Sequence, residues 1–113
     1  MSKIFYLHGG TTHSTQDKFY EYLKTKSIEL EKRSPIWTDM LETHFPSQQI
    51  IRVSLPNKNN ADYKAWELVF QKYIPHIDAH SILIGFSLGA SFLLKYISPV
   101  SYTHLTLPTI CSV

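Results

Sequence analysis

The chain is poor in cysteine, in long apolar runs and in net charge, and each shortage excludes a class of protein. Its single cysteine, Cys111, permits neither a disulfide framework nor a thiolate metal site. No apolar run approaches the length that spans a bilayer. The net charge of +2 is small and dispersed, which argues against nucleic acid or an anionic membrane as a partner. Because the N-terminal residues have the pattern of a strand and not of a signal peptide, we expect a soluble, cytoplasmic protein.

The motif that carries chemistry is Gly-Phe-Ser-Leu-Gly at residues 85–89. It follows an apolar run typical of a buried strand and precedes a stretch with helical spacing. A serine at a tight strand-to-helix turn is the arrangement that presents a hydroxyl as a nucleophile. The turn is sharp, so we expect a side chain at Gly85 or Gly89 to collide with the neighbouring strand or helix. We therefore predict that Ser87 is catalytic. The alternative is a turn serine that only caps the following helix.

Three short apolar runs, at residues 4–7, 50–55 and 82–84, predict strands, and stretches of helical spacing alternate with them. This alternation predicts an α/β fold, a three-stranded parallel sheet with helices on both faces. Four helices are expected. The first begins after a capping Ser14 or Thr15, and the second covers residues 34–45. The third runs from a capping Asn60 to Pro75, and the last covers residues 90–97. The second helix is expected to place Ile36, Trp37, Met40, Leu41 and Phe45 on one side. The third carries an aromatic stripe that we interpret as packing on the sheet, formed by Tyr63, Trp66, Phe70 and Tyr73.

In such sheets the chemistry lies at the carboxyl ends of the strands. His-Gly-Gly at residues 8–10, the loop 56–60 and Ser87 all lie at these ends. The backbone N–H of Leu88, at the start of a helix, is expected to be the first donor to an oxyanion. The second is expected from Gly10, where the lack of a Cβ lets a substrate approach; a plain turn at Gly9 and Gly10 is the alternative. We expect His8 to be structural rather than a catalytic base.

A first strand that ends in His-Gly-Gly, together with Gly-x-Ser-Leu-Gly, resembles the α/β-hydrolase superfamily. Leu-Pro-Asn-Lys-Asn-Asn-Ala at residues 55–61, followed by Trp66, resembles the small serine hydrolases related to retinoblastoma-binding protein 9. The resemblance covers residues 3–98. It implies a partial α/β-hydrolase fold with the strand order 2-1-3. It also implies that the catalytic acid and histidine follow the serine in the chain.

The last part of the chain has a different character. Reverse translation of residues 100–109 reproduces the transposase mosaic end and primer site of a common sequencing library, and Val113 precedes the expected stop codon. We therefore divide the chain into residues 1–99, the N-terminal part of an α/β-hydrolase domain, and residues 100–113, a tail translated from an adapter. His104 falls in this tail and is not expected to serve as the base. The strand at residues 82–84 is expected to expose an unpaired edge that favours self-association.

These observations predict an esterase-like serine hydrolase that forms an acyl intermediate on Ser87, truncated in this chain and inactive without its acid and histidine. The expected partner is a small-molecule acyl or ester substrate, and no protein partner is predicted. No cofactor is expected, and no spacing of His, Asp and Glu indicates a metal site. The alternative is a non-catalytic interaction module with an α/β-hydrolase-like fold. An acyltransferase or thioesterase would use the same residues with another acceptor.

Overall fold

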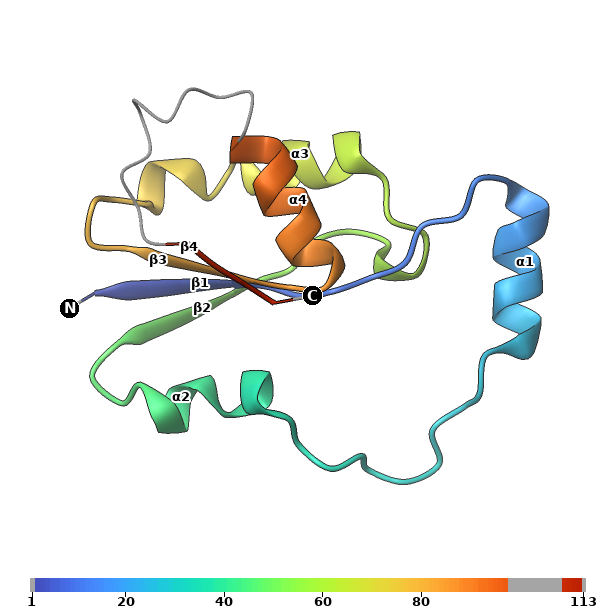
Figure 1. Ribbon diagram of the computed structural model, residues 1–113, viewed down its shortest axis with the longest axis horizontal. Helices are drawn as coiled ribbons and strands as arrows, with labels where there is room; N and C mark the ends of the chain where they lie inside the picture. The colour runs from blue at the N-terminus through green and yellow to red at the C-terminus, as the bar shows by residue number, and fades with distance from the viewer. Residues whose placement is uncertain (1, 98–108, 113) are drawn as a thin grey trace.

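The computed structural model describes residues 2–97 and 109–112, and its centre is a parallel sheet (Figure 1). The strands are β1 (Lys3–Leu7), β2 (Gln49–Val53), β3 (Ile82–Phe86) and β4 (Thr109–Ser112). Their order across the sheet is β2-β1-β3-β4, and every neighbouring pair is parallel. The predicted α/β class and the order 2-1-3 are thereby confirmed.

The register aligns the carboxyl ends of the first three strands. Leu7 at the end of β1 lies opposite Val53 of β2 on one side and Gly85 of β3 on the other. The central strand is covered on both faces, because the side chains of Ile4 and Phe5 point to opposite faces and both are fully buried. The segments that follow these strands therefore emerge together at one edge of the sheet.

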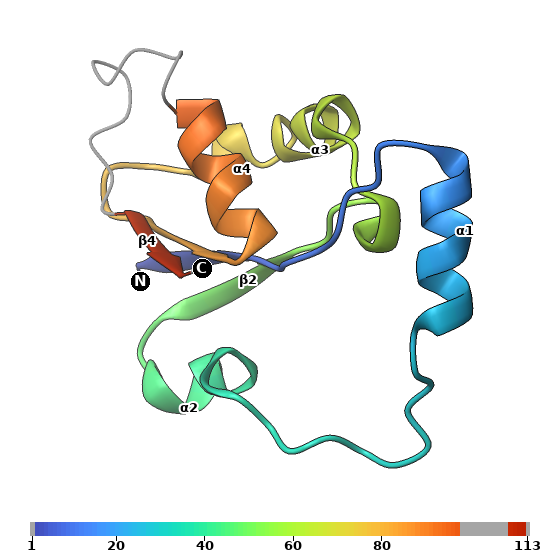
Figure 2. The same ribbon diagram turned by 45° about the vertical axis from the view of Figure 1, so that its right-hand side comes forward.

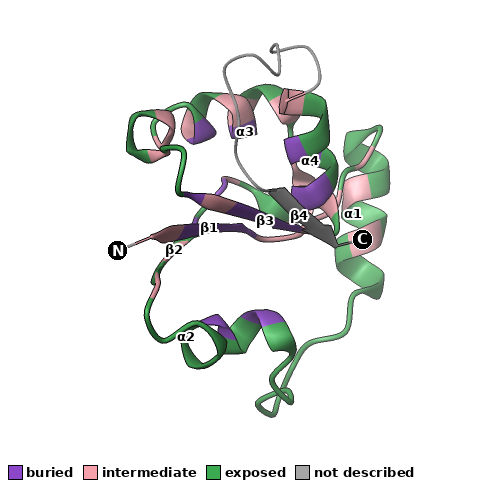
Figure 3. Cartoon of the chain, turned by 60° about the vertical axis from the view of Figure 1, so that its left-hand side comes forward, coloured by how far each residue is buried: buried purple, intermediate pink, exposed green. Residues whose placement is uncertain are grey.

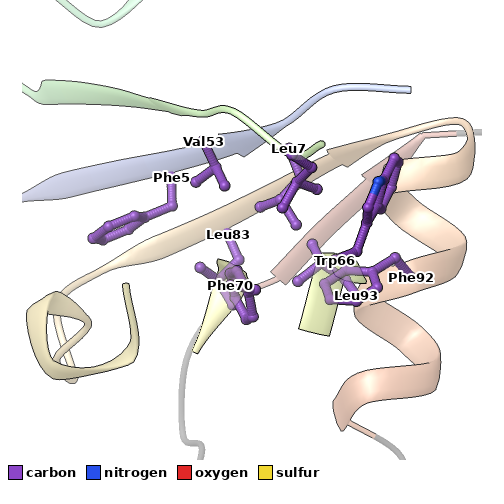
Figure 4. Close-up of a cluster of buried hydrophobic side chains, with 9 residues drawn as sticks. Phe5, Leu7, Val53, Trp66, Phe70, Leu83, Phe92 and Leu93 are labelled. Carbon is purple, nitrogen blue, oxygen red and sulfur yellow. The ribbon is translucent and has the colours of Figure 1, made fainter. Parts of the chain in front are cut away.

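One face of the sheet is covered by α3 (Tyr63–Phe70) and α4 (Leu88–Ile97). Aromatic rings from both helices pack edge-on: Phe92 lies 5.7 Å from Trp66 and 5.6 Å from Phe70 between ring centroids. Figure 4 shows these rings over the side chains of the three strands. The buried cluster consists of Phe5, Leu7, Val53, Leu55, Trp66, Phe70, Leu83, Phe92 and Leu93. The aromatic stripe thus packs on the sheet, as predicted.

The other face carries a smaller cluster beneath α2 (Leu41–His44). Leu41 is fully buried there against Ile4, Tyr6 and Ile84. Figure 3 shows that α2 and the turn before it lie on the side of the sheet opposite α3 and α4. Helices on both faces are therefore confirmed.

The second helix is shorter than predicted. A 3₁₀ turn, Trp37–Met40, precedes α2, and residues 34–36 are not helical. The reason is local: the carboxylate of Asp39 accepts the amide of Ile36 at 2.9 Å and pairs with Arg33 at 2.8 Å, so the turn is capped at residue 36. Only Leu41 of the expected apolar side is buried. The other four remain about two-fifths exposed: Ile36 (41%), Trp37 (43%), Met40 (39%) and Phe45 (38%).

The predicted start and end of the third helix are also corrected. Its N-cap is Asp62, whose carboxylate accepts the amide of Ala65 at 3.0 Å, and not Asn60. Asn60 instead ends a 3₁₀ turn, Lys58–Asn60. The helix stops at Phe70, and Pro75 lies within a further 3₁₀ turn, Ile74–His76.

The first helix, α1 (Gln16–Thr25), is capped by the hydroxyl of Thr15 as predicted, with 3.1 Å to the amide of Lys18. It has no buried residue, and it stands apart from the sheet in both ribbon views (Figures 1 and 2). Its contacts reach the loop after β1, where His13 lies 4.7 Å from Tyr22 between ring centroids. Within residues 2–97 and 109–112, no helix has the length and apolarity needed to cross a membrane.

The edge of β3 is not left unpaired. Four residues of the C-terminal tail form β4, with Leu83 opposite Thr109 and Phe86 opposite Ser112. The expectation of an open edge at β3 is therefore wrong for this chain. A strand edge with free N–H and C=O groups is a template on which another segment can pair.

Candidate active site

Ser87 occupies the junction between β3 and α4 in a left-handed backbone conformation. Its φ is 55°, and Asn57 is the one other non-glycine residue of the described chain with a positive φ. Strand β3 ends at Phe86 and α4 begins at Leu88, so the whole reversal of direction falls on this residue. The side chain is exposed. Its strained backbone therefore carries the hydroxyl outward at the edge of the sheet.

The two glycines beside Ser87 are required by space. A Cβ at Gly85 would lie 2.6 Å from the Cα of Ala90, inside the backbone of α4. A Cβ at Gly89 would lie 2.5 Å from the carbonyl oxygen of Leu7, at the end of β1. No described glycine has a positive φ. Glycine is therefore required at these positions because it lacks a side chain, and not because the backbone is left-handed. Helix α4 can thus pack directly onto β1 and β3.

The other two glycines of the chain, Gly9 and Gly10, allow the loop after β1 to approach Ser87 and Leu88 closely. A Cβ on Gly9 would lie 3.3 Å from the Cβ of Ser87. One on Gly10 would lie 2.6 Å from the carbonyl oxygen of Lys58 and 3.4 Å from Cδ2 of Leu88. Segments about 80 residues apart in the chain therefore meet at Ser87, as the parallel topology requires. All four glycines in the sequence lie at this junction.

The backbone amides of Leu88 and Gly10 lie at this junction. Leu88 is the first residue of α4, where amides have no acceptor within the helix. Within the described residues, neither Leu88 nor Gly10 donates a backbone hydrogen bond outside the helices and strands. The positive end of the α4 dipole lies at the same point. The arrangement suits an oxygen that gains negative charge near Ser87.

His8 holds the loop after β1 and has no free ring nitrogen. Its Nε2 accepts the amide of Leu55 at 2.9 Å, so the proton of the neutral ring is on Nδ1. That Nδ1–H donates to the carbonyl oxygen of Gly9 at 2.7 Å. The ring also packs edge-on against Trp66, 5.5 Å between centroids. The geometry agrees with a structural residue.

The loop after β2 forms the other wall of the junction, and the sequence did not predict its detailed pairing. The amide of Thr11 donates to the carbonyl of Lys58 at 2.7 Å, and the amide of Ala61 donates to the carbonyl of Thr11 at 2.8 Å. Asn57 turns the loop with a φ of 53°. Asparagine tolerates this conformation better than most residues, which is the signal that a reader of the sequence could have used.

A pocket of about 190 Å³ lies between the N-terminal ends of α3 and α4, and we call it the α3–α4 pocket. From the sequence, the aromatic residues of this pocket were expected to serve packing alone. Partial burial, with a smaller contribution from the carboxylate of Glu67, raises the pKa of Tyr63 in its wall. The phenol therefore stays neutral near pH 7. The apolar wall is made by Ala61, Tyr63, Trp66, Leu88 and Phe92.

Among residues 2–97 and 109–112, Ser87 has no hydrogen-bonded partner of the kind that activates a serine. Within the described residues no side chain makes a hydrogen bond with its hydroxyl, and His8 is fully engaged elsewhere. His104 lies outside the described residues. No group of three His, Cys, Asp or Glu side chains in the described chain could hold a metal ion. In the part of the chain that the structure describes, the junction combines an exposed serine with two backbone amides, and no histidine is hydrogen-bonded to that serine.

Comparison with known proteins supports the fold. No protein-family profile and no curated protein sequence matches the chain. Among solved structures, the chain is similar to the ydeN gene product from B. subtilis, an α/β-hydrolase-like protein, at 14% sequence identity and a TM-score of 0.55. The match covers 89% of this chain and 45% of that chain, so this chain spans less than half of its length. The chain therefore has part of an α/β-hydrolase-like fold.

Proposed function

We propose that Ser87 is the nucleophile of a serine hydrolase that cleaves esters through an acyl-serine intermediate. One observation carries the proposal: a non-glycine residue with a φ of 55° is held exposed between a strand and a helix. A left-handed conformation costs an L-residue roughly 1–2 kcal/mol. Such strain persists where the surrounding structure enforces it, and it is concentrated at functional sites.

The two free amides supply the second requirement of acyl transfer. In the proposed reaction the carbonyl oxygen of the ester becomes an oxyanion as Ser87 attacks, and the N–H groups of Leu88 and Gly10 donate to it. The loss of one such donor raises the barrier by about 3–4 kcal/mol in enzymes of this type. The donors belong to the backbone, so no side-chain substitution removes them directly.

The proposal includes a base and an acid that the described residues do not supply. A serine hydroxyl needs a histidine to take its proton and a carboxylate to orient that histidine. We propose that both follow residue 99 in the intact protein, on loops after later strands, and that the 113-residue chain alone has no appreciable turnover. A closer relationship to the small serine hydrolases related to retinoblastoma-binding protein 9 is part of this proposal and rests on the motifs of the sequence. A cytoplasmic location is also part of it and rests on the strand-like pattern at the N-terminus.

The test is ester hydrolysis by a longer protein in which residues 1–99 continue into later strands. With p-nitrophenyl acetate, Ser87→Ala is expected to reduce kcat/KM by at least about a thousandfold, because the nucleophile acts as one unit with its base. The matched control is Ser27→Ala, which changes an exposed serine far from the junction along the chain. Activity in Ser87→Ala equal to that in Ser27→Ala would contradict the proposal.

A non-catalytic interaction module is the second candidate, and one observation favours it: no described histidine makes a hydrogen bond with the hydroxyl of Ser87. The two candidates differ in the coding sequence after residue 99. A hydrolase requires an Asp or Glu and then a His on loops that follow further strands. An intact gene without that order of residues would favour the interaction module.

A further inference from the structure

The α3–α4 pocket adjoins both proposed oxyanion donors. Leu88, whose amide is one of the proposed donors, also lines the pocket. The Cβ position of Gly10, the other donor, lies 3.3 Å from Cζ2 of Trp66 and 3.4 Å from Cδ2 of Leu88, and both side chains line the pocket. A carbonyl oxygen held by the two amides would therefore place one of its neighbouring groups at the mouth of this pocket.

The chemistry of the pocket matches a compact apolar group. Its floor consists of the rings of Trp66 and Phe92, which are 1% and 4% exposed. Two charged side chains also line the pocket: the ammonium of Lys95 lies 4.3 Å from the ring centroid of Tyr63, and the carboxylate of Asp62 caps α3. Burial of hydrocarbon against such a floor stabilises binding, whereas a charged group would lose its hydration there.

The size of the pocket sets a limit on the ligand. Pockets for drug-sized molecules are about 300–1,000 Å³, which exceeds this volume of about 190 Å³. It has room for about six groups of the size of a water molecule, at roughly 30 Å³ each. A short acyl group fits, and a long fatty chain does not.

We propose that the α3–α4 pocket binds the short, uncharged acyl group of the ester substrate, and so selects short-chain esters. This assignment of a substrate class rests on the proposed role of Ser87. Binding itself needs no hydrolysis, so it is expected in the 113-residue chain, where the ligand is not consumed.

The chain's two tryptophans provide the measurement. The indole N–H of Trp66 donates to the carbonyl of Pro56 at 2.7 Å at the pocket, whereas Trp37 is 43% exposed on the opposite face of the sheet. Titration with methyl esters of straight-chain acids, followed by ¹H–¹⁵N NMR, is expected to shift the Trp66 signal and to leave Trp37 unchanged. Affinity should rise about fourfold for each added methylene and stop rising near a six-carbon acyl chain.

Two substitutions on α4 make the test specific. Ser91→Phe fills the pocket from its rim and is expected to abolish the Trp66 shift. Leu94→Phe, on the same helix at a residue 57% exposed, is expected to preserve it. The proposal is overturned by equal shifts at Trp37, by a shift that survives Ser91→Phe, or by affinity that keeps rising to octanoate. If the longer protein shows no hydrolysis that depends on Ser87, the proposed function is overturned. The NMR shifts of Trp66 in the 113-residue chain would still be expected.

Discussion

The Nδ1–H of His8 donates to the carbonyl oxygen of Gly9 at 2.7 Å, and this bond sets the direction of the next amide. A trans peptide is planar, so its N–H points opposite to its C=O. With the Gly9 carbonyl turned toward the imidazole, the N–H of Gly10 points away from it. His8 thus acts on the proposed site through the backbone, without contact with a reacting atom.

Removal of this bond is expected to destabilise the loop after β1. His8→Leu leaves the carbonyl of Gly9 and the amide of Leu55 without a partner, and because both bonds are only partly buried we expect a cost of about 1 kcal/mol. His8→Asn keeps a donor near the position of Nδ1 and should cost less. Urea unfolding of the two variants measures the difference, and equal losses would contradict the role assigned to the Gly9 bond.

Addition of a methyl group at Gly89 is expected to separate α4 from the sheet. Its Cβ would meet the carbonyl oxygens of Leu7 and His8, which are backbone atoms that cannot rotate away. We expect Gly89→Ala to lower the free energy of unfolding by about 1–3 kcal/mol or more. Gly9→Ala is the matched control, because its nearest contact is 3.2 Å and a small shift relieves it. A larger loss for Gly9→Ala than for Gly89→Ala in urea unfolding would contradict this account of the packing.

The strain at Ser87 predicts a reversal of the usual ranking of alanine and glycine. With a φ of 55°, Ser87→Gly relieves roughly 1–2 kcal/mol of strain and costs about 0.5–1 kcal/mol in chain entropy. It should therefore be about 0.5–1 kcal/mol more stable than Ser87→Ala. At Ser91, within α4, alanine should be the more stable by about 1 kcal/mol. If thermal unfolding shows alanine to be more stable than glycine at both positions, Ser87 is unstrained.

Acid is expected to weaken the turn before β3. The backbone N–H of His80 donates to the carboxylate of Asp78 at 2.8 Å and lowers its pKa, with a further contribution from the hydroxyl of Ser81. A carboxylate whose pKa is lower in the folded state stabilises the fold above its unfolded pKa, and this contribution is lost as the pH falls below about 4. The carboxylates of Asp39 and Glu42, paired with arginines, act in the same direction.

Asp78→Asn tests this dependence, because it removes the titrating group and keeps an acceptor for the His80 amide. The urea midpoint of the variant should fall less between about pH 7 and pH 3 than that of the parent chain. Exposed carboxylates contribute modestly, so a small difference is expected. An identical fall in both proteins would contradict the role of Asp78.

The sequence predicted the sheet better than the helices. The three apolar runs and their order follow from burial of a central parallel strand, which leaves a strong pattern. The limits of the helices near residues 34–45 and 60–75 were missed, because single side chains set them. The carboxylate of Asp39 caps the turn at Ile36, and the carboxylate of Asp62 caps α3. The strand β4 could not be foreseen from a segment set aside as an adapter.

The candidate site shows the same division. The place of Ser87, Gly85 and Gly89 at the turn between β3 and α4 was predicted, because a sharp turn constrains residue types at fixed spacing. The bonds of His8 and the α3–α4 pocket were not, because they depend on how distant segments meet: Trp66 packs on His8 and also lines the pocket. The helical periodicity predicts that Trp66 is in the core, but it carries no information on the contact with His8 or on the pocket.

The central claim is tested most directly by covalent labelling. A longer protein that continues beyond residue 99 is treated with a fluorophosphonate probe, and the modified residue is located by tandem mass spectrometry. The account predicts one adduct per chain on Ser87, with no labelling of Ser87→Ala. An unmodified Ser87 in a folded protein that carries the later acid and histidine, or equal labelling of the alanine variant, would contradict it.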